Sequence, residues 1–127
     1  METLLFHKDV FAPDFLFQTS DILRLRYGPH ALDAAENDHY GDLRPHLPRR
    51  VDLGDPDLSI VEVEVLRNGD NASISKRVVR YPVSNTLTLV LVVTADGFVR
   101  TVWGNRTDDN HRTLKRHLYV QAPKTLH

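Results

Sequence analysis

The sequence contains no cysteine, and this absence excludes several kinds of protein chemistry at once. The chain has no disulfide, no cysteine-ligated zinc or iron–sulfur site and no thiol nucleophile. Cysteine-free chains are typical of a reducing compartment, so we expect a cytoplasmic protein. No stretch approaches the roughly 18 apolar residues of a membrane-spanning helix, and residues 1–8 lack the pattern of a signal peptide. We therefore expect no membrane partner.

The motifs of three common enzyme classes are missing as well. The sequence has no Gly-x-Ser-x-Gly of serine hydrolases, no phosphate-binding P-loop and no Gly-x-Gly-x-x-Gly of dinucleotide-binding proteins. It contains 7 histidines, but their spacing does not place two ligands on one helical face as metal sites do. We therefore predict that the protein uses neither a metal ion nor another cofactor.

The formal net charge of -1 conceals an uneven distribution of charge along the chain. Residues 1–75 carry 7 basic against 14 acidic side chains, whereas residues 76–127 carry 9 basic against 3 acidic ones. A basic C-terminal half predicts a surface that faces an anionic partner, with nucleic acid as one candidate. The alternative is that the two halves simply attract each other within one fold.

The length of 127 residues leaves room for one domain, which we place at residues 1–127. The first segment (1–19) carries apolar side chains without a clear period and predicts an N-terminal arm or short helix that packs on the core. Residues 42–57 are rich in proline and charge and predict an ordered connection inside the domain. Residues 123–127 predict a short tail.

Three stretches predict helices. Ser20 is a typical helix cap, which predicts a helix over 22–27. Proline at the first position predicts a second helix over 29–40, and Gly41 suits the left-handed conformation that ends it. Several cap residues followed by leucines four positions apart predict a short, basic C-terminal helix over 111–119.

Four stretches between these helices predict the strands of an antiparallel meander. Residues 61–65 alternate valine with glutamate. Residues 74–83 predict a second strand, in which Lys76, Val78 and Arg80 share one face and Pro82 marks the end or an edge position. Residues 86–94 are apolar on both sides, which indicates the central strand, and the Asp-Gly pair at 96–97 predicts a hairpin into residues 98–103. The predicted fold class is α+β, with N-terminal helices, a four-stranded antiparallel sheet and a short C-terminal helix.

Residues that suit RNA chemistry concentrate where the last predicted strand ends and the last helix begins. Metal-free RNA cleavage needs a group that takes the proton of the ribose 2′-OH, a group that protonates the leaving 5′-oxygen, and cations that hold the phosphate. His111 and His30 are candidates for proton transfer, although each also suits a helix start. The candidate substrate-binding residues are Arg100, Trp103, Asn105, Arg106 and Arg112, of which Trp103 also suits packing and Asn105 a turn.

Two short motifs resemble the small RNases of the barnase–colicin–RelE superfamily. One is the helix start Pro-His-Ala at residues 29–31, with Asp38 and Gly41 further on, and the other is the strand end Arg-Thr-Val-Trp at residues 100–103. The order of elements is also similar over residues 20–120. The resemblance implies a toxin-type endoribonuclease that cleaves RNA without a metal on the open face of its sheet.

The resemblance also implies which residues act. Members of that superfamily use histidine, arginine, and threonine, tyrosine or glutamine from the first helix, the strands and the C-terminal end. In this chain, His30 lies on a matched motif, and four other residues are analogous by placement. The predicted catalytic residues are therefore His30, Arg80, His111, Thr113 and Tyr119. RNA is the predicted substrate, and an antitoxin or a host protein is a further expected partner.

Two other classes of function also fit the sequence. One is a non-catalytic binding protein, such as a phage or mobile-element inhibitor of a host protein, or an immunity-type partner whose acidic half mimics nucleic acid. The other is an RNA- or DNA-binding module without chemistry, which steeply salt-dependent binding would identify. A fold does not fix a function, so both alternatives stay open at this point.

Overall fold

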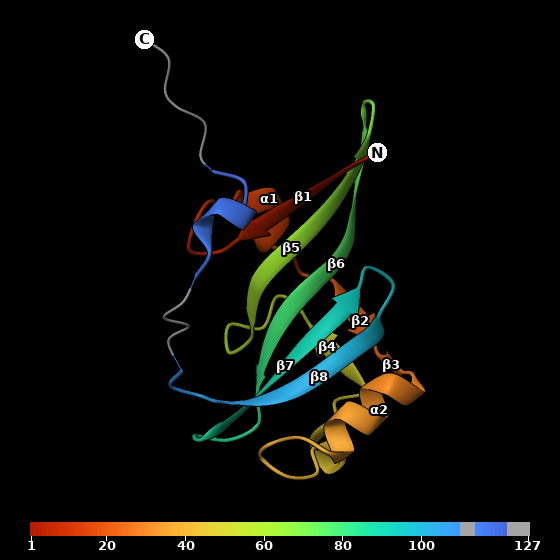
Figure 1. The fold of residues 1–127 in the computed structure, drawn as a ribbon, viewed down its shortest axis with the longest axis vertical. Coiled ribbons are helices and arrows are strands. Elements are labelled where there is room, and N and C mark those ends of the chain that lie inside the picture. The colour runs from red at the N-terminus through yellow and green to blue at the C-terminus, as the bar shows by residue number, and fades with distance from the viewer. Residues whose placement is uncertain (110–113, 122–127) are drawn as a thin grey trace.

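A twisted six-stranded sheet dominates the computed structural model, which describes residues 1–109 and 114–121 (Figure 1). The strand order is β1-β5-β6-β7-β8-β3, in which β3 is parallel to β8 and all other neighbours are antiparallel. A separate two-stranded sheet pairs β2 with β4. The elements are β1 (Glu2–His7), α1 (Asp14–Phe17), β2 (Ile22–Arg24), β3 (Arg26–Tyr27), α2 (Pro29–Glu36), the 3₁₀ helix η1 (Arg44–His46), β4 (Arg50–Asp52), β5 (Ser59–Asn68), β6 (Asn71–Pro82), β7 (Leu87–Thr94), β8 (Phe98–Arg106) and the 3₁₀ helix η2 (Arg116–Leu118).

The predicted α+β architecture is wrong, because the protein is mostly β and its large sheet has six strands with mixed directions. The stretch 22–27 was predicted to be a helix and instead forms β2 and β3. Its true period is two: Leu23, Leu25 and Tyr27 pack against the core, while the two arginines between them are exposed. Among the described residues, α2 is the only helix longer than four residues.

Both ends of the described chain also differ from the prediction. The segment 1–19 does contain a short helix on the core, α1 with Leu16 buried, but its first residues form β1, which pairs with β5 along the outer edge of the sheet. The described part of the predicted C-terminal helix contains only the single turn η2. Residues 110–113 and the predicted tail (123–127) lie outside the described residues. None of the described helices has the length and apolar character needed to cross a lipid bilayer.

The four predicted strands of the meander are confirmed as β5 to β8; β5 and β8 are longer than predicted, β6 begins earlier, and β7 begins one residue later. The hairpin at residues 96–97 joins β7 to β8 as predicted. Helix α2 begins at Pro29, as the proline predicts, and ends at Glu36, four residues before the predicted end. Gly41 has a φ of 99°, so the chain after α2 does turn at the expected glycine.

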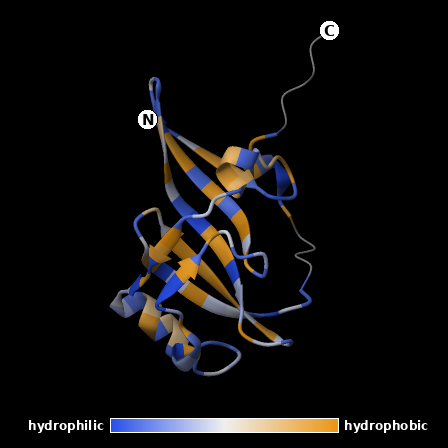
Figure 2. Ribbon diagram, turned by 180° about the vertical axis from the view of Figure 1, so that it is seen from behind, coloured by the Kyte–Doolittle hydropathy of each residue, from blue (hydrophilic) through white to orange (hydrophobic). Residues whose placement is uncertain are grey.

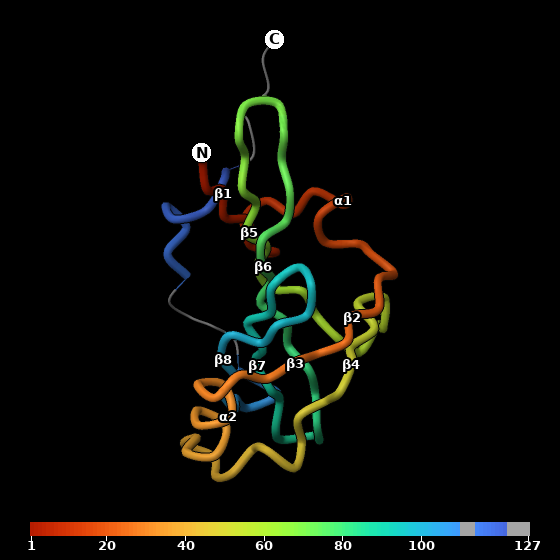
Figure 3. Tube along the Cα trace, turned by 90° about the vertical axis from the view of Figure 1, so that its right-hand side faces the viewer, coloured from red at the N-terminus to blue at the C-terminus, as the bar shows by residue number. Residues whose placement is uncertain are grey.

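The hydrophobic core lies on one face of the six-stranded sheet. Side chains of alternate residues point to opposite faces, and in β7 one set, which includes Leu89 and Leu91, is fully buried. Burying such a side chain contributes roughly 1.5–3 kcal/mol. Helix α1 and the β2–β4 sheet cover this face, while α2 packs along β8 (Figures 2 and 3). The other face, which we call the open face, carries the alternate residues of the same strands.

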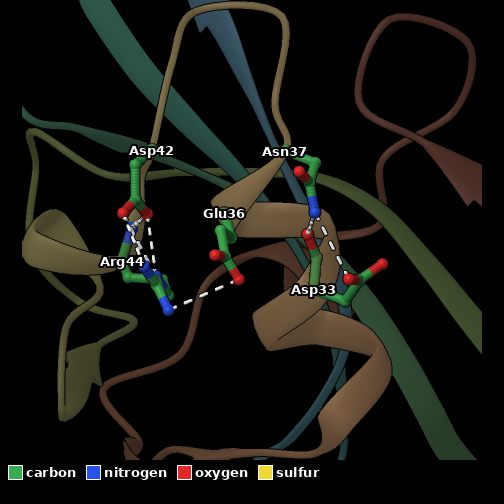
Figure 4. A network of polar contacts seen from close by, with 5 residues as sticks. All are labelled: Asp33, Glu36, Asn37, Asp42 and Arg44. Atoms are coloured by element: carbon green, nitrogen blue, oxygen red, sulfur yellow. Dashed lines mark hydrogen bonds and ion pairs between the residues drawn. The ribbon is translucent and has the colours of Figure 1, made fainter.

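Surface polar contacts fix the chain after α2 (Figure 4). The guanidinium of Arg44 binds Asp42 through two nitrogens, at 3.0 and 2.8 Å, and lies 3.4 Å from Glu36. The hydrogen bond from Arg44 holds the pKa of Asp42 below its ordinary value. Asn37 donates to the carbonyl of Asp33 at 3.0 Å and ends the helix. These contacts are exposed, so they orient this loop more than they stabilise the fold.

Gly97 allows the closest backbone approach in the structure, and replacing it with alanine should be strongly destabilising. Its φ is 98°, and a Cβ would lie 2.0 Å from the carbonyl oxygen of Arg24. Strain and overpacking together predict a loss of about 3 kcal/mol in the free energy of unfolding for Gly97→Ala. Gly69→Ala is the matched control, because its φ is 62° and nothing lies within 4 Å of its Cβ position. Urea denaturation of both variants tests this, and equal losses would contradict it.

Candidate functional site

A pocket of about 450 Å³ lies on the open face beside the C-terminal segment 114–121. The open face contributes the floor because β5 to β8 run side by side beneath it (Figure 1). The C-terminal segment returns to β1 and forms one wall, and the amide of Val120 donates to the carbonyl of Leu5 at 2.8 Å. The lining residues are His7, Val61, Glu62, Lys76, Val78, Arg80, Val90, Val92, Trp103, Leu114, Lys115, Leu118 and Tyr119.

The floor of this pocket is apolar and its flanks are charged, and both follow from the pairing register. Val78 pairs with Val92 across β6 and β7, so their side chains stand next to each other on the open face. In the neighbouring row, Val90 pairs with Arg80 on one side and with Trp103 on the other. A strip of valines therefore separates a cation from an indole.

Lys76 and Arg80 provide positive charge from β6, where they share the open face because they are four residues apart on one strand. The guanidinium of Arg80 donates to the carbonyl of Arg106 at 3.1 Å, so the side chain reaches across the sheet toward the end of β8. The ammonium of Lys76 lies 3.4 Å from the carboxylate of Glu64. Lys115 adds a further cation from the C-terminal segment.

Trp103 is 39% exposed and does not belong to the hydrophobic core. Its position depends on the residue that follows, because the amide of Gly104 donates to the carboxylate of Asp38 at 3.0 Å. A Cβ at position 104 would lie 2.8 Å from that carboxylate and 3.2 Å from the ring of Tyr40. The turn after α2 is thus attached to β8 at the residue that follows Trp103. Asp38 and Gly41, which the sequence marks as part of one motif, both belong to this turn.

A buried polar cluster closes the other end of the pocket. The hydroxyl of Tyr119 donates to the carboxylate of Glu62 at 2.6 Å. The ring of Tyr119 lies edge-on against His7, with 5.0 Å between ring centroids, and His7 is only 5% exposed. Burial, then the hydrogen bond and charge of Glu62, raise the pKa of Tyr119 to about 12. The hydroxyl of Tyr119 acts as a hydrogen-bond donor to Glu62 in this structure.

A second pocket of about 540 Å³ adjoins the first and shares two of its residues, Lys76 and Val92. It lies between the start of α2 and the open face at β8. Its lining residues are Gly28, Pro29, His30, Ala31, Lys76, Val92, Phe98, Arg100 and Thr101. We call the two pockets together the open-face groove. Its formally charged residues are four cations and one carboxylate, namely Lys76, Arg80, Arg100, Lys115 and Glu62.

Five of the ten predicted site residues line the open-face groove. They come from α2, the two strands β6 and β8 and the C-terminal segment, and they are His30, Arg80, Arg100, Trp103 and Tyr119. Two others lie at the end of β8 outside both linings: the side chain of Asn105 accepts the amide of Arg106, and Arg106 forms an exposed ion pair with Asp108 at 3.1 Å. The remaining three, His111, Arg112 and Thr113, fall outside the described residues.

Several groove residues were not predicted as part of the site, among them Lys76, Glu62 and His7. Lys76 and Glu62 carried a usable signal, because Lys76 shares its strand face with Arg80 and Glu62 belongs to an alternating strand. His7 carried none, because no strand was predicted around it. Arg77 is a charged residue that lies elsewhere: it points into the core face and is 6% exposed, and its Nε has no hydrogen-bond partner among the described residues. Its burial lowers its pKa, and nearby Asp21 acts in the opposite direction.

A metal cluster or a related protein would identify the chemistry of the open-face groove directly. Within the described ranges, no three His, Cys, Asp or Glu side chains gather so as to hold a metal ion. Comparison of the chain with protein-family models, with curated proteins and with solved structures finds no match. The function is therefore inferred from the side chains of the groove.

Tyr119→Phe should loosen the C-terminal wall of the groove. The variant keeps the ring against His7 but removes the hydrogen bond to Glu62, which predicts a loss of about 1 kcal/mol in the free energy of unfolding. The amide of Val120 should exchange with deuterium faster than in the wild type, because the same segment anchors it. Tyr40→Phe, at a residue that is 48% exposed, is the matched control. Unchanged exchange at Val120 would argue against this role of the hydroxyl.

The folded protein should lose stability at alkaline pH. The pKa of Tyr119 is raised from 10.0 to about 12, so its contribution is complete below pH 10.0 and is lost as the pH rises through about 12. Tyr27, which donates to the carbonyl of Pro48 at 2.6 Å, has a pKa that burial also raises, and it adds to the loss. Urea denaturation at increasing pH measures the effect. A Tyr119→Phe variant with the same alkaline decline as the wild type would show that Tyr119 does not contribute.

Proposed function

We propose that the protein is a metal-independent endoribonuclease of the toxin type that acts in the cytoplasm. One observation carries this proposal. Five residues that the sequence predicts to act on RNA line two adjoining pockets on one face of the sheet, although they come from α2, β6, β8 and the C-terminal segment. Residues distant in sequence that meet in a concave, partly apolar site are the usual sign of a ligand-binding surface. An antitoxin or host protein as a further partner stays a prediction.

The charge of the open-face groove supports a polyanionic substrate. Its four cations outnumber its one carboxylate, although the whole chain has a net charge of -1. Lys76 belongs to both pockets, with Arg80 on one side of it and Arg100 on the other. These three cations suit the successive phosphates of an RNA strand, because an arginine or lysine binds a phosphate oxygen by a charge-assisted hydrogen bond. We assign phosphate binding to them.

The proposed reaction is attack of a ribose 2′-oxygen on the adjacent phosphate. The 2′-OH loses its proton, a new O–P bond forms, and the bond to the 5′-oxygen breaks as that oxygen takes up a proton, which leaves a 2′,3′-cyclic phosphate. His30 is the proposed proton-transfer group, because an imidazole exchanges protons near neutral pH and His30 lines the same pocket as Arg100. The protonated hydroxyl of Tyr119 and its partner Glu62 hold the wall of the groove.

Incubation of the purified protein with a mixed RNA in the presence of EDTA tests the proposal. We expect cleavage to products that end in a cyclic phosphate. His30→Ala should lower the cleavage rate by roughly 10²- to 10⁴-fold, the usual contribution of a positioned acid or base. Arg80→Ala should lower it by roughly 10- to 100-fold, as expected for a lost charged hydrogen bond to phosphate.

Matched controls separate these effects from general damage. His46 on η1 and Arg50 on β4 are exposed and lie outside the groove lining, so His46→Ala and Arg50→Ala should cleave at the wild-type rate. RNA that stays intact with the wild-type protein would overturn the proposal. Intact RNA combined with tight, steeply salt-dependent binding would instead identify a binding module without chemistry.

A further inference from the structure

We infer that the open-face groove accepts single-stranded RNA and holds one unpaired base against Trp103. This inference rests on the proposed function, which it narrows to a class of substrate. The indole lines the first pocket outside the core and extends from the strand next to the valine floor, whereas the other partly exposed aromatic ring of that lining, Tyr119, is engaged with His7 and Glu62. The Asp38–Gly104 contact fixes the backbone of β8 at the next residue, so the point from which the indole projects is set before any ligand arrives. A preorganised backbone lowers the free-energy cost of binding.

The surroundings of Trp103 match a nucleobase in shape and polarity. Val90 lies directly between Trp103 and Arg80 in one cross-strand row, and Val78 and Val92 continue the apolar floor. Neighbouring strands are about 4.8 Å apart, so the Trp103 and Arg80 positions are separated by about 10 Å. Within this row the guanidinium of Arg80 reaches across toward β8 and Val90 is only 2% exposed, so the open part of the floor is the pair Val78 and Val92. We place one base on these two valines, with a face against the indole. The phosphate attached to that base then lies near the guanidinium.

The arrangement favours an unpaired base over a duplex. In an RNA helix each base is stacked on both faces, and side chains cannot reach the base faces from the deep, narrow major groove. An indole in the wall of a pocket can stack only on a base that is splayed out of its strand. The cations on both sides of the floor, Arg80 in the first pocket and Arg100 in the second, allow the strand to enter at one side and leave at the other.

Trp103 is the only tryptophan of the chain, so its intrinsic fluorescence reports this site alone. The probe is a 2′-O-methyl RNA oligonucleotide of mixed sequence, in which the attacking hydroxyl is blocked and cleavage cannot occur. We expect the single strand to quench the fluorescence in a saturable manner. The same oligonucleotide annealed to its complement should bind roughly 10-fold more weakly or worse and leave the fluorescence nearly unchanged.

Affinity measured by anisotropy of a labelled oligonucleotide completes the test. Trp103→Ala should weaken binding of the single strand by roughly 10- to 100-fold, and Trp103→Phe should recover most of that loss. Phe15→Ala is the matched control, because Phe15 is an 80% exposed aromatic on α1, away from the open face. A single strand that binds without quenching, or a duplex that binds and quenches equally well, would overturn the inference.

These outcomes are distinct from those that test cleavage. If the protein cleaves RNA but the blocked single strand leaves Trp103 fluorescence unchanged, the base subsite is wrong and the proposed function stands. If the blocked strand quenches the fluorescence with the expected dependence on Trp103 but natural RNA stays intact, the subsite is correct and the proposed function is wrong.

Discussion

The pairing register of β6, β7 and β8 is the constraint on which both the core and the open-face groove depend. Because side chains alternate between faces, the register that buries Val79 and Leu91 also presents Arg80 and Val90 on the opposite side. A shift by one residue would expose the core and bury the cations together. The burial of the core therefore also determines which side chains line the groove. The same strand register brings the valines of its floor next to the charged residues of its flanks. The hairpin at Gly97 fixes this register between the last two strands.

The central strands could be predicted from the sequence because each carries a local period of two or a long apolar run, and because an Asp-Gly pair joins two of them. The short strands could not. Ser20 and the acid after it resemble a helix start. This local signal for a helix conflicts with the alternation from Leu23 to Tyr27, which indicates a strand. β3 exists only because it pairs in parallel with the distant β8, and β1 because it pairs with β5. Such long-range pairing cannot be deduced from a short segment alone, even where the segment alternates as residues 23–27 do.

Individual residues of the candidate site could be predicted from the sequence, but their assembly on one face of the sheet could not. His30, Arg80 and Trp103 were each selected for their chemistry, yet their shared face depends on strand order and on the turn that Asp38 locks onto β8. The division of charge along the sequence was only a partial guide. The positive region is the open face of the sheet, where Lys76 lines both pockets. The acidic residue Glu62 lies in the same region. Position in the fold, and not position in the sequence, separates the charges.

The hydrogen bond from Val120 to Leu5 has a consequence for solubility. β1 is the outer strand of the sheet, and such a strand offers free backbone groups that invite other chains to extend the sheet. The returning C-terminal segment occupies one of these groups, so the peptide that forms the wall of the groove also guards the edge against aggregation. A change that moves the C-terminal segment away from the groove at this end also uncovers a backbone group at the edge of the sheet.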